Sequence, residues 1–232
     1  VRTREGLQQE GIDTRFLFTD GEQPSGTALI MVDDHGENCI AVASGANANL
    51  SERDLASLPF FESTCTILMQ LEISLETVEW VADKADQRQK LILNPAPAQP
   101  LSPDLLKKLF LIVPNESEAS LLTGITVTDK HSAERAAGLL LEKGVQQVII
   151  TLGAQGALLK NKDVCLIAEA PTVQALDTTA AGDTFCGALA VALNENRTWP
   201  EALAFAVAAA SLSVTRLGAQ SSVPYRHELP LT

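Results

Sequence analysis

Short apolar runs alternate with longer helix-like segments through the middle of the chain. The runs occupy 66–71, 91–94, 109–113 and 148–151. Such alternation is typical of βαβ units, in which buried parallel strands are covered by helices on both faces of the sheet. The pattern therefore predicts an α/β fold with a mainly parallel central sheet.

A β-hairpin is expected ahead of this region, with its strands at 26–33 and 38–44. The first strand is apolar on both faces, and a two-stranded ribbon cannot cover both faces by itself. One face could close over a ligand while the other meets a second subunit, or both could join the main core. We therefore divide the chain into a small hairpin element, 16–44, and an α/β body made of 1–15 and 45–232.

The two ends of the chain are expected to be helical. Residues 1–11 show helix-like periodicity with hardly any capping segment before them, so the sequence is expected to begin inside a helix. After a second hairpin, 157–168, two long Ala-rich helices are predicted at about 182–194 and 200–215. A polar loop that ends at Pro224 follows them.

Composition and charge narrow the classes of function. Only 4% of residues are aromatic although 46% are hydrophobic, which suits helices packed on a sheet. The net charge of -12 argues against nucleic-acid and anionic-membrane surfaces, which favour Lys and Arg. No apolar run approaches the roughly 18 residues of a membrane span. The sequence thus predicts a soluble, cytoplasmic protein without nucleic-acid or membrane partners.

The cysteines are scattered and form no C-x-x-C pair. They are Cys39, Cys65, Cys165 and Cys186. Their apolar surroundings predict small buried hydrophobes rather than disulfides, zinc ligands or reactive thiols.

The stretch from Asp177 to Phe185 is the first candidate for chemistry. Ala180, Ala181 and Gly182 precede Asp183 at an expected helix start, so unhindered N–H groups and the positive end of the dipole would make an anion hole. The same field would keep Asp183 ionised, as a base beside a phosphate must be. The alternative is an ordinary helix start with an N-capping Asp.

Asn115 and Glu118 are the second candidate, directly after the run 109–113. They are three residues apart, so on the first turn of a helix their oxygens face the same way and suit water-mediated Mg²⁺. The same spacing is also that of a capping box, in which the two side chains bind each other's backbone N–H.

Two glycine-containing loops complete the candidates. Gly153 and Gly156 follow the run 148–151 and would let the backbone approach a ligand, although Gly-x-x-Gly is more often a plain turn. The loop 213–222 reads locally as a helix end capped near Gly218.

Taken together, these motifs resemble a known family. The run Asp177-Thr-Thr-Ala-Ala-Gly-Asp-Thr-Phe-x-Gly-Ala is similar to the C-terminal signature of the carbohydrate kinase family that includes ribokinase, adenosine kinase and fructokinase, with Ala at a position where Gly is common. The resemblance extends nearly end to end. The first hairpin, the stretch 45–47 and Asn94-Pro-Ala-Pro are most similar to ribokinases.

The resemblance implies a ribokinase-like three-layer α/β/α fold with a hairpin lid through which the chain forms a homodimer. It implies ATP-dependent phosphorylation of D-ribose to D-ribose 5-phosphate, or of deoxyribose, fructose or a nucleoside. Asp183 would be the general base, the amides of Ala180 to Asp183 the anion hole, and Glu72 a sugar contact. Asn115 and Glu118 would act on Mg²⁺ through water.

Two further sets of residues are implied by the resemblance alone. The ATP contacts would be Asn115, Thr151, Leu152, Gly153, Ala154, Gln155, Gly156, Gly182, Asp183 and Val207. A potassium ion would be held at Asp177, Thr179, Ser213, Arg216, Gly218 and Ser222, mostly through backbone oxygens.

The sequence departs from the family in one respect. Ribokinases carry an earlier Asn-x-Asp strand end and a Gly-Gly-Lys-Gly-Ala-Asn loop that grip the sugar, and neither occurs here. The expectation is therefore a fragment, a truncated product or one half of a complex, and a catalytically silent nucleotide-binding remnant is an alternative to an active kinase.

Overall fold

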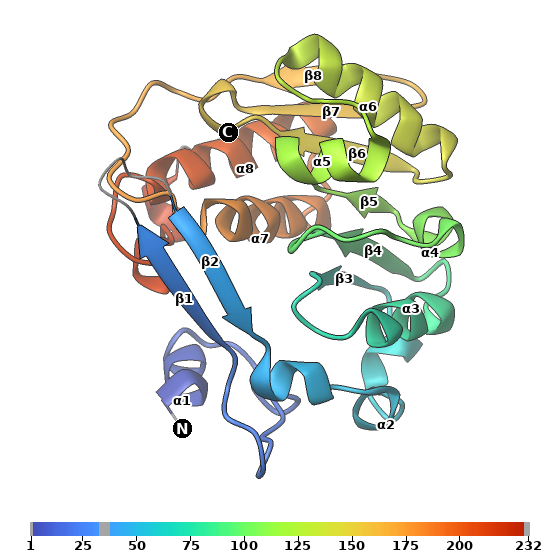
Figure 1. Ribbon diagram of the computed structural model, residues 1–232, viewed down its shortest axis with the longest axis vertical. Helices are drawn as coiled ribbons and strands as arrows, with labels where there is room; N and C mark the ends of the chain where they lie inside the picture. Colours follow the sequence, from blue (N-terminus) through green and yellow to red (C-terminus); the bar gives the residue numbers. More distant parts are fainter. Residues whose placement is uncertain (1, 33–37, 230–232) are drawn as a thin grey trace.

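The computed structural model describes residues 2–32 and 38–229 of the chain; of residues 28–42, only the backbone of the two strands they contain is described. A six-stranded sheet forms the centre of the molecule (Figure 1). Its strands follow the order of the sequence: β3 (Cys65–Met69), β4 (Gln89–Leu93), β5 (Leu111–Ile112), β6 (Gln147–Thr151), β7 (Ala157–Asn161) and β8 (Cys165–Ala168). The first four are parallel, and β7 and β8 extend the sheet as an antiparallel hairpin.

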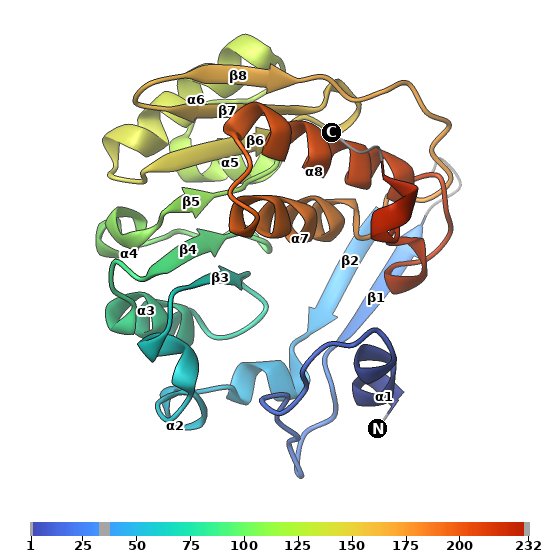
Figure 2. The same ribbon diagram turned by 180° about the vertical axis from the view of Figure 1, so that it is seen from behind.

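Helices cover both faces of the sheet (Figures 1 and 2). The helices are α1 (Arg2–Gln9), α2 (Glu52–Leu55), α3 (Leu75–Lys84), α4 (Pro103–Lys108), α5 (Glu116–Thr123), α6 (Lys130–Glu142), α7 (Ala181–Asn194) and α8 (Trp199–Ser213). Helices α3 to α6 pack on one face, and α7 and α8 on the other. The predicted three-layer α/β/α architecture is confirmed.

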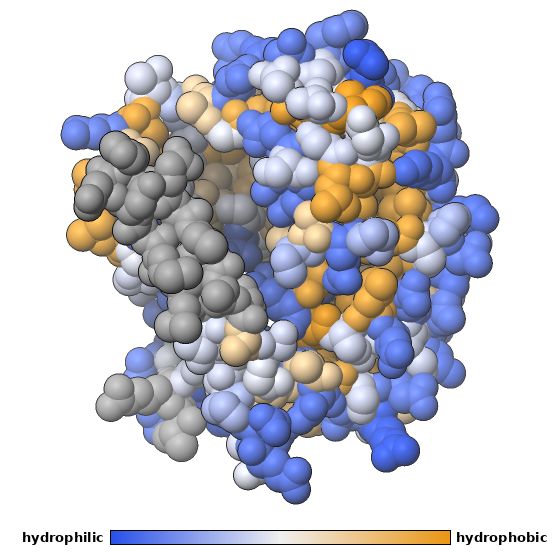
Figure 3. Space-filling view, viewed as in Figure 1, coloured by the Kyte–Doolittle hydropathy of each residue, from blue (hydrophilic) through white to orange (hydrophobic). Residues whose placement is uncertain are grey.

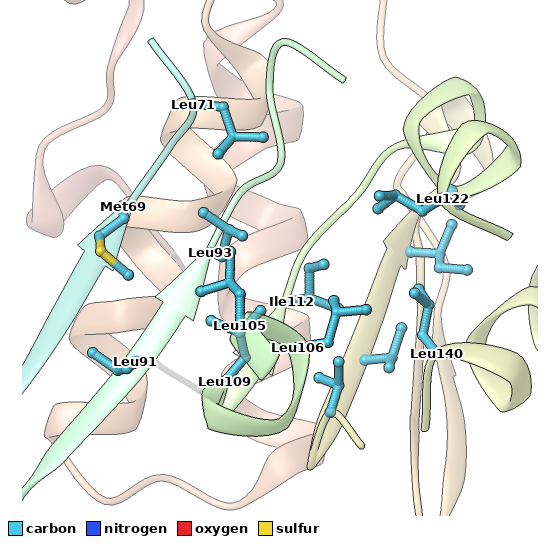
Figure 4. Close-up of a cluster of buried hydrophobic side chains, with 14 of the residues drawn as sticks. Met69, Leu71, Leu91, Leu93, Leu105, Leu106, Leu109, Ile112, Leu122 and Leu140 are labelled. Atoms are coloured by element: carbon cyan, nitrogen blue, oxygen red, sulfur yellow. The ribbon is translucent and has the colours of Figure 1, made fainter. Parts of the chain in front are cut away.

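The strands supply alternate side chains to two separate cores. In β4, Leu91 and Leu93 join the core under α3 to α6, whereas Ile92 joins the core under α7 and α8. In β6, Ile150 and Ile149 divide in the same way. Figure 4 shows the first core, in which leucines from β4 interleave with those of α4. Each fully buried side chain of this kind contributes roughly 1.5–3 kcal/mol, so both helical layers are held firmly against the sheet.

The first hairpin forms a two-stranded sheet of its own. Strands β1 (Thr27–Val32) and β2 (Asn38–Ala43) pair antiparallel, with Thr27 opposite Ala43. Both ribbon views place the hairpin apart from the six-stranded sheet and beside α7 (Figures 1 and 2). The predicted turn and the two apolar faces of β1 lie outside the described residues.

Some details differ from the sequence-based expectation. The run 109–113 forms only a two-residue strand, because Leu109 still caps α4 by donating its N–H to the carbonyl of Leu106. Cys165 is exposed, so the expectation that every cysteine is buried is wrong; it lies on the edge strand β8, where alternate side chains face outward. Cys186 is buried as expected.

No helix within the described residues combines the length and the apolar character that a membrane crossing needs.

Candidate functional site

The two polar motifs that follow β5 and β6 lie side by side. The N–H of Thr151 donates to the carbonyl of Pro114 at 3.0 Å, which joins the end of β6 to the residue just before Asn115. The carboxyl ends of neighbouring parallel strands meet at one edge of a sheet, where ligands bind in open α/β folds. The pair Asn115 and Glu118 and the loop that contains Gly153 and Gly156 therefore lie at the same edge of the sheet.

Helix α7 starts from a left-handed residue. Ala180 is the N-cap residue, with φ 59° and ψ 15°. For a residue other than Gly this conformation costs roughly 1–2 kcal/mol. The turn before α7 therefore places an alanine in a conformation that glycine adopts freely.

The first turn of α7 presents free backbone N–H groups. The N–H of Ala181 donates to the carbonyl of Thr178 at 3.3 Å, but within the described part of the chain no hydrogen bond uses the N–H of Gly182 or Asp183. A Cβ placed on Gly182 would meet nothing within 4 Å. Figure 3 shows the surface hollowed beside the end of α7 that lies nearest the hairpin in Figure 1. The positive end of the 14-residue helix and two unpaired amides thus face an open space that suits an anion.

Asp183 and Glu118 lie near a common neighbour. Asp183 is exposed in the first turn of α7, as predicted, and it is followed one turn later by buried Cys186. Burial, followed by the negative charges of Asp183 and Glu118, raises the pKa of Cys186 to about 12. The start of α7 therefore lies close enough to the start of α5 for both carboxylates to act on one thiol.

Asn115 and Glu118 form a reciprocal capping box, which was the alternative to a metal site. The N–H of Asn115 donates to Glu118 Oε2 at 2.8 Å, and the N–H of Glu118 donates to Asn115 Oδ1 at 2.8 Å. Asn115 Nδ2 also donates to Glu118 Oε1 at 3.0 Å. Burial raises the pKa of Glu118, and the hydrogen bond from the backbone of Asn115 opposes this rise. In the described parts of the chain, no three His, Cys, Asp or Glu side chains group closely enough to hold a metal ion.

The glycines of the loop after β6 serve different purposes. Both have positive φ, 50° at Gly153 and 93° at Gly156. A Cβ on Gly156 would lie 2.0 Å from the carbonyl oxygen of Ala168 at the end of β8, whereas a Cβ on Gly153 would meet nothing within 4 Å. Gly156 is therefore required for close packing of the β7–β8 hairpin. Gly153 instead faces open space, and of the two it is the one placed to approach a ligand.

The Asp177 carboxylate joins the turn before α7 to the loop after α8. Asp177 Oδ1 accepts from the N–H of Thr179 and Oδ2 from the N–H of Gly218, both at 2.9 Å. Hydrogen bonds from the Thr179 side chain, then from the backbones of Gly218 and Thr179, lower the pKa of Asp177. The carbonyl of Val214 accepts from the N–H groups of both Leu176 and Asp177. The loop and the turn are thus held together at three points.

The other side chains proposed for the potassium site in this loop form hydrogen bonds or an ion pair with nearby residues. Ser213 and Ser222 are fully buried, and their hydroxyls donate to the carbonyls of Ala210 and Ala219. Arg216 pairs with Glu228, with 2.5 Å between Nη2 and Oε1. Most of the potassium residues implied by the resemblance therefore lie in one ordered region around Asp177.

Two candidates lie elsewhere. Val207 is 5% exposed and belongs to the core between the sheet, α7 and α8. Glu72 is exposed in the bend after β3.

Sequence reasoning did not single out Thr184. This buried residue donates both its N–H and its hydroxyl to the carbonyl oxygen of Ala180, each at 2.9 Å. The sequence feature that could have identified Thr184 is its position four residues after Ala180, because a helical Thr hydroxyl can donate to the carbonyl four residues earlier.

The sequence matches one protein family over almost its whole length. The profile described as pfkB family carbohydrate kinase matches residues 2–226. The chain is 46% identical to a ribokinase of Haemophilus influenzae over 228 residues, which cover 97% of this chain and 74% of that protein.

Solved structures of ribokinases share the fold. The crystal structure of a ribokinase from Thermotoga maritima superposes with a TM-score of 0.84 at 38% identity, covering 97% of this chain and 74% of that one. A ribokinase from Arabidopsis thaliana, solved in complex with ribose and ATP, gives a TM-score of 0.80 at 33% identity, covering 89% of this chain and 68% of that one.

Proposed function

Because the chain belongs to the pfkB family of carbohydrate kinases, we propose that it is a phosphotransferase that converts ATP and D-ribose to ADP and D-ribose 5-phosphate. Identity of 46% to a ribokinase over nearly the whole chain supports ribose as the acceptor. The structural similarity to a ribokinase that was solved with ribose and ATP supports both substrates.

The start of α7 is the observation that carries the proposal. Gly182 and Asp183 present unpaired N–H groups to open space, and the exposed carboxylate of Asp183 stands on the same turn. Phosphoryl transfer requires donors for the charge on the transferred group and an acceptor for the proton of the attacking hydroxyl. One helical turn supplies both.

The reaction follows from these groups. The primary hydroxyl oxygen of the sugar attacks the γ-phosphorus of ATP, its proton passes to the carboxylate of Asp183, and the bond from the γ-phosphorus to the bridging oxygen breaks to release ADP. The amides of Ala180 to Asp183 stabilise the charge on the transferring group. The N–H of Ala181 donates to the carbonyl of Thr178 at 3.3 Å, a long bond that a phosphate oxygen would replace at little cost.

The nucleotide is assigned to the edge of the sheet near β6. The loop from Thr151 to Gly156, with Leu152, Ala154 and Gln155, would contact ATP, and Gly153 would allow the closest approach because nothing lies within 4 Å of its missing Cβ. Val207 would contribute apolar packing from α8 behind this region. Asn115 completes the set of proposed contacts.

Magnesium is assigned to Asn115 and Glu118 through water. Their oxygens are hard donors, and each oxygen that already accepts one hydrogen bond retains a lone pair for a water ligand. Bound Mg²⁺ would neutralise phosphate charge. The capping box fixes both side chains in advance.

Potassium is assigned to the loop after α8 and the turn before α7. Each carboxylate oxygen of Asp177 accepts one N–H group and retains a lone pair, and Arg216 is paired with Glu228, so the oxygens available to a cation are the Asp177 carboxylate and neutral backbone oxygens. One carboxylate together with neutral oxygens suits a monovalent cation. Bound K⁺ would add to the hydrogen bonds that already hold the turn.

Three further roles rest on the family resemblance. Glu72 would contact the sugar, and the β1–β2 hairpin would act as a lid and as the contact of a homodimer. We also assign the protein to the cytoplasm.

A coupled assay of ADP formation tests the proposal. With Mg²⁺ and K⁺ present, D-ribose should give faster turnover than deoxyribose, fructose or adenosine. Asp183→Asn should lower kcat by at least about 10²-fold while ATP binding is kept, since general-base catalysis contributes about 10²–10⁴-fold. Asp104→Asn is a matched control, because Asp104 is also an exposed Asp in the first turn of a helix.

The outcomes are distinct. Full activity of the Asp183 variant would disprove its role as the base, and preference for another sugar would reassign the substrate. Thermal stabilisation by ATP without turnover on any sugar would indicate a nucleotide-binding protein that is not a kinase.

A further inference from the structure

We propose that Thr184 is a positioning residue that locks the first turn of α7 in its anion-binding conformation. The proposal rests on the function assigned above to that turn. Thr184 is 6% exposed, so its hydroxyl lies inside the protein rather than among the ligand-binding groups. It acts through the backbone of Ala180.

The carbonyl oxygen of Ala180 is the fixed point of the turn. It accepts the N–H and the hydroxyl of Thr184, each at 2.9 Å. The segment enclosed by these bonds consists of Ala181, Gly182 and Asp183, which are the residues that present the amides and the carboxylate. Closing this segment twice fixes the direction of all three peptide groups, because each peptide unit is planar and moves as one piece.

The turn needs this second bond because two of its residues do not favour the observed conformation. The left-handed backbone conformation is unfavourable for an alanine such as Ala180, and glycine, found at Gly182, is the most flexible residue type. A helix start normally relies on an N-cap side chain, but Ala180 has none that can accept a hydrogen bond. The Thr184 hydroxyl supplies from inside the helix the restraint that a capping side chain would give from outside.

Thr184→Val tests the hydroxyl, since Val has almost the same shape and lacks the donor. We expect kcat to fall about five- to tenfold with the KM for ribose changed less than about twofold, as for the loss of one hydrogen bond. Thr184→Ser keeps the donor and should stay within about twofold of the unchanged protein. Thr123→Val is a matched control: Thr123 also donates to the carbonyl four residues earlier, at 2.6 Å, in α5.

A double-mutant cycle separates positioning from a general loss of stability. Gly at position 180 adopts the left-handed conformation without strain, so in Ala180→Gly protein the Thr184→Val change should lower kcat by less than about twofold. An equal loss of kcat in both backgrounds would overturn the proposal. An equal loss in the Ser and Val variants would also overturn it.

Hydrogen exchange gives a readout that needs no activity. The two hydrogen-bonded amides of this turn, those of residues 181 and 184, should lose protection several-fold in Thr184→Val relative to Thr184→Ser or Thr123→Val, after correction for intrinsic exchange rates, because local opening breaks their hydrogen bonds. Unchanged exchange would refute the role of Thr184. If the unchanged protein lacks turnover, the proposed kinase function fails, while this exchange experiment still decides whether Thr184 holds the turn.

Discussion

The loop after β6 allows two glycines with positive φ to be compared within four residues. We predict that Gly156→Ala destabilises the protein severely and that Gly153→Ala does so mildly. The φ values are 50° at Gly153 and 93° at Gly156, so each alanine brings a conformational cost of at least roughly 1–2 kcal/mol. Gly156 also has a ψ of -130°, which lies outside the left-handed helical region and adds to the cost at that position.

The space available to a Cβ atom adds a further difference between the two variants. A Cβ at position 156 would lie 2.0 Å from the carbonyl oxygen of Ala168 and 2.8 Å from the N of Ala170, and both are backbone atoms that cannot rotate away. Overpacking of this kind typically adds about 1–3 kcal/mol, which together with the conformational cost gives a total of about 2–5 kcal/mol for Gly156→Ala. At position 153 nothing lies within 4 Å, so no such cost is added.

Urea unfolding at equilibrium measures both changes, provided that the slope with denaturant is the same in the two variants. Calorimetry with Mg-ATP then separates stability from binding. Gly153→Ala should weaken ATP binding in a protein that remains folded, because the new methyl group enters the space assigned to the nucleotide. Equal unfolding free energies for the two variants would refute the assignment of Gly156 to hairpin packing. Unchanged ATP affinity in Gly153→Ala would refute the assignment of Gly153 to the ligand.

Two further predictions concern the ionisable groups around α7. Burial and the charges of Asp183 and Glu118 raise the pKa of Cys186 to about 12, and burial and the charge of Glu134 also raise the pKa of Cys165. A maleimide at about pH 8 should therefore label exposed Cys165 slowly in the folded protein and Cys186 only after urea unfolding; labelling of Cys186 in the folded protein as fast as that of Cys165 would contradict its burial. The second prediction concerns Glu118, whose folded-state pKa lies above the ordinary 4.5, so the folded chain binds its proton more tightly than the unfolded chain does. The contribution of Glu118 to stability is therefore fully present below about pH 4.5 and is lost as the pH rises through the raised folded-state pKa. Urea titrations at a series of pH values should show the unfolding free energy of Glu118→Gln, relative to that of the unchanged protein, increasing over this pH range. A difference that stays constant with pH would show that the pKa of Glu118 is not shifted in the folded protein.

The pattern of apolar residues predicted the α/β/α layers correctly, because the apolar residues of each strand show which of its faces are buried. In β6, Val148 and Ile150 face one helical layer and Ile149 faces the other, so an unbroken apolar run had to be a strand covered on both sides. The start of α7 was predicted for a similar reason. Small residues before Asp183 leave the backbone accessible, and that information is local.

Contacts between distant residues could not be predicted in this way. The Asp177 carboxylate accepts the N–H of Gly218, 41 residues later in the sequence, and no local pattern reports such a contact. The left-handed conformation of Ala180 was also hidden, since alanine usually indicates an ordinary helix. For Asn115 and Glu118 the sequence left a cap and a metal site open, and the structure shows the cap because the two side chains satisfy each other's backbone.

The contact between Asp177 and Gly218 also determines when the turn before α7 can form in a growing chain. Asp183 emerges from the ribosome before Gly218, because synthesis proceeds from the N-terminus. The turn therefore gains this partner only after Gly218 has emerged from the ribosome. An unfinished copy that stops before Gly218 would carry every residue of the proposed anion hole without one of the bonds that hold the turn, so we expect nascent chains to remain inactive until Gly218 has been added.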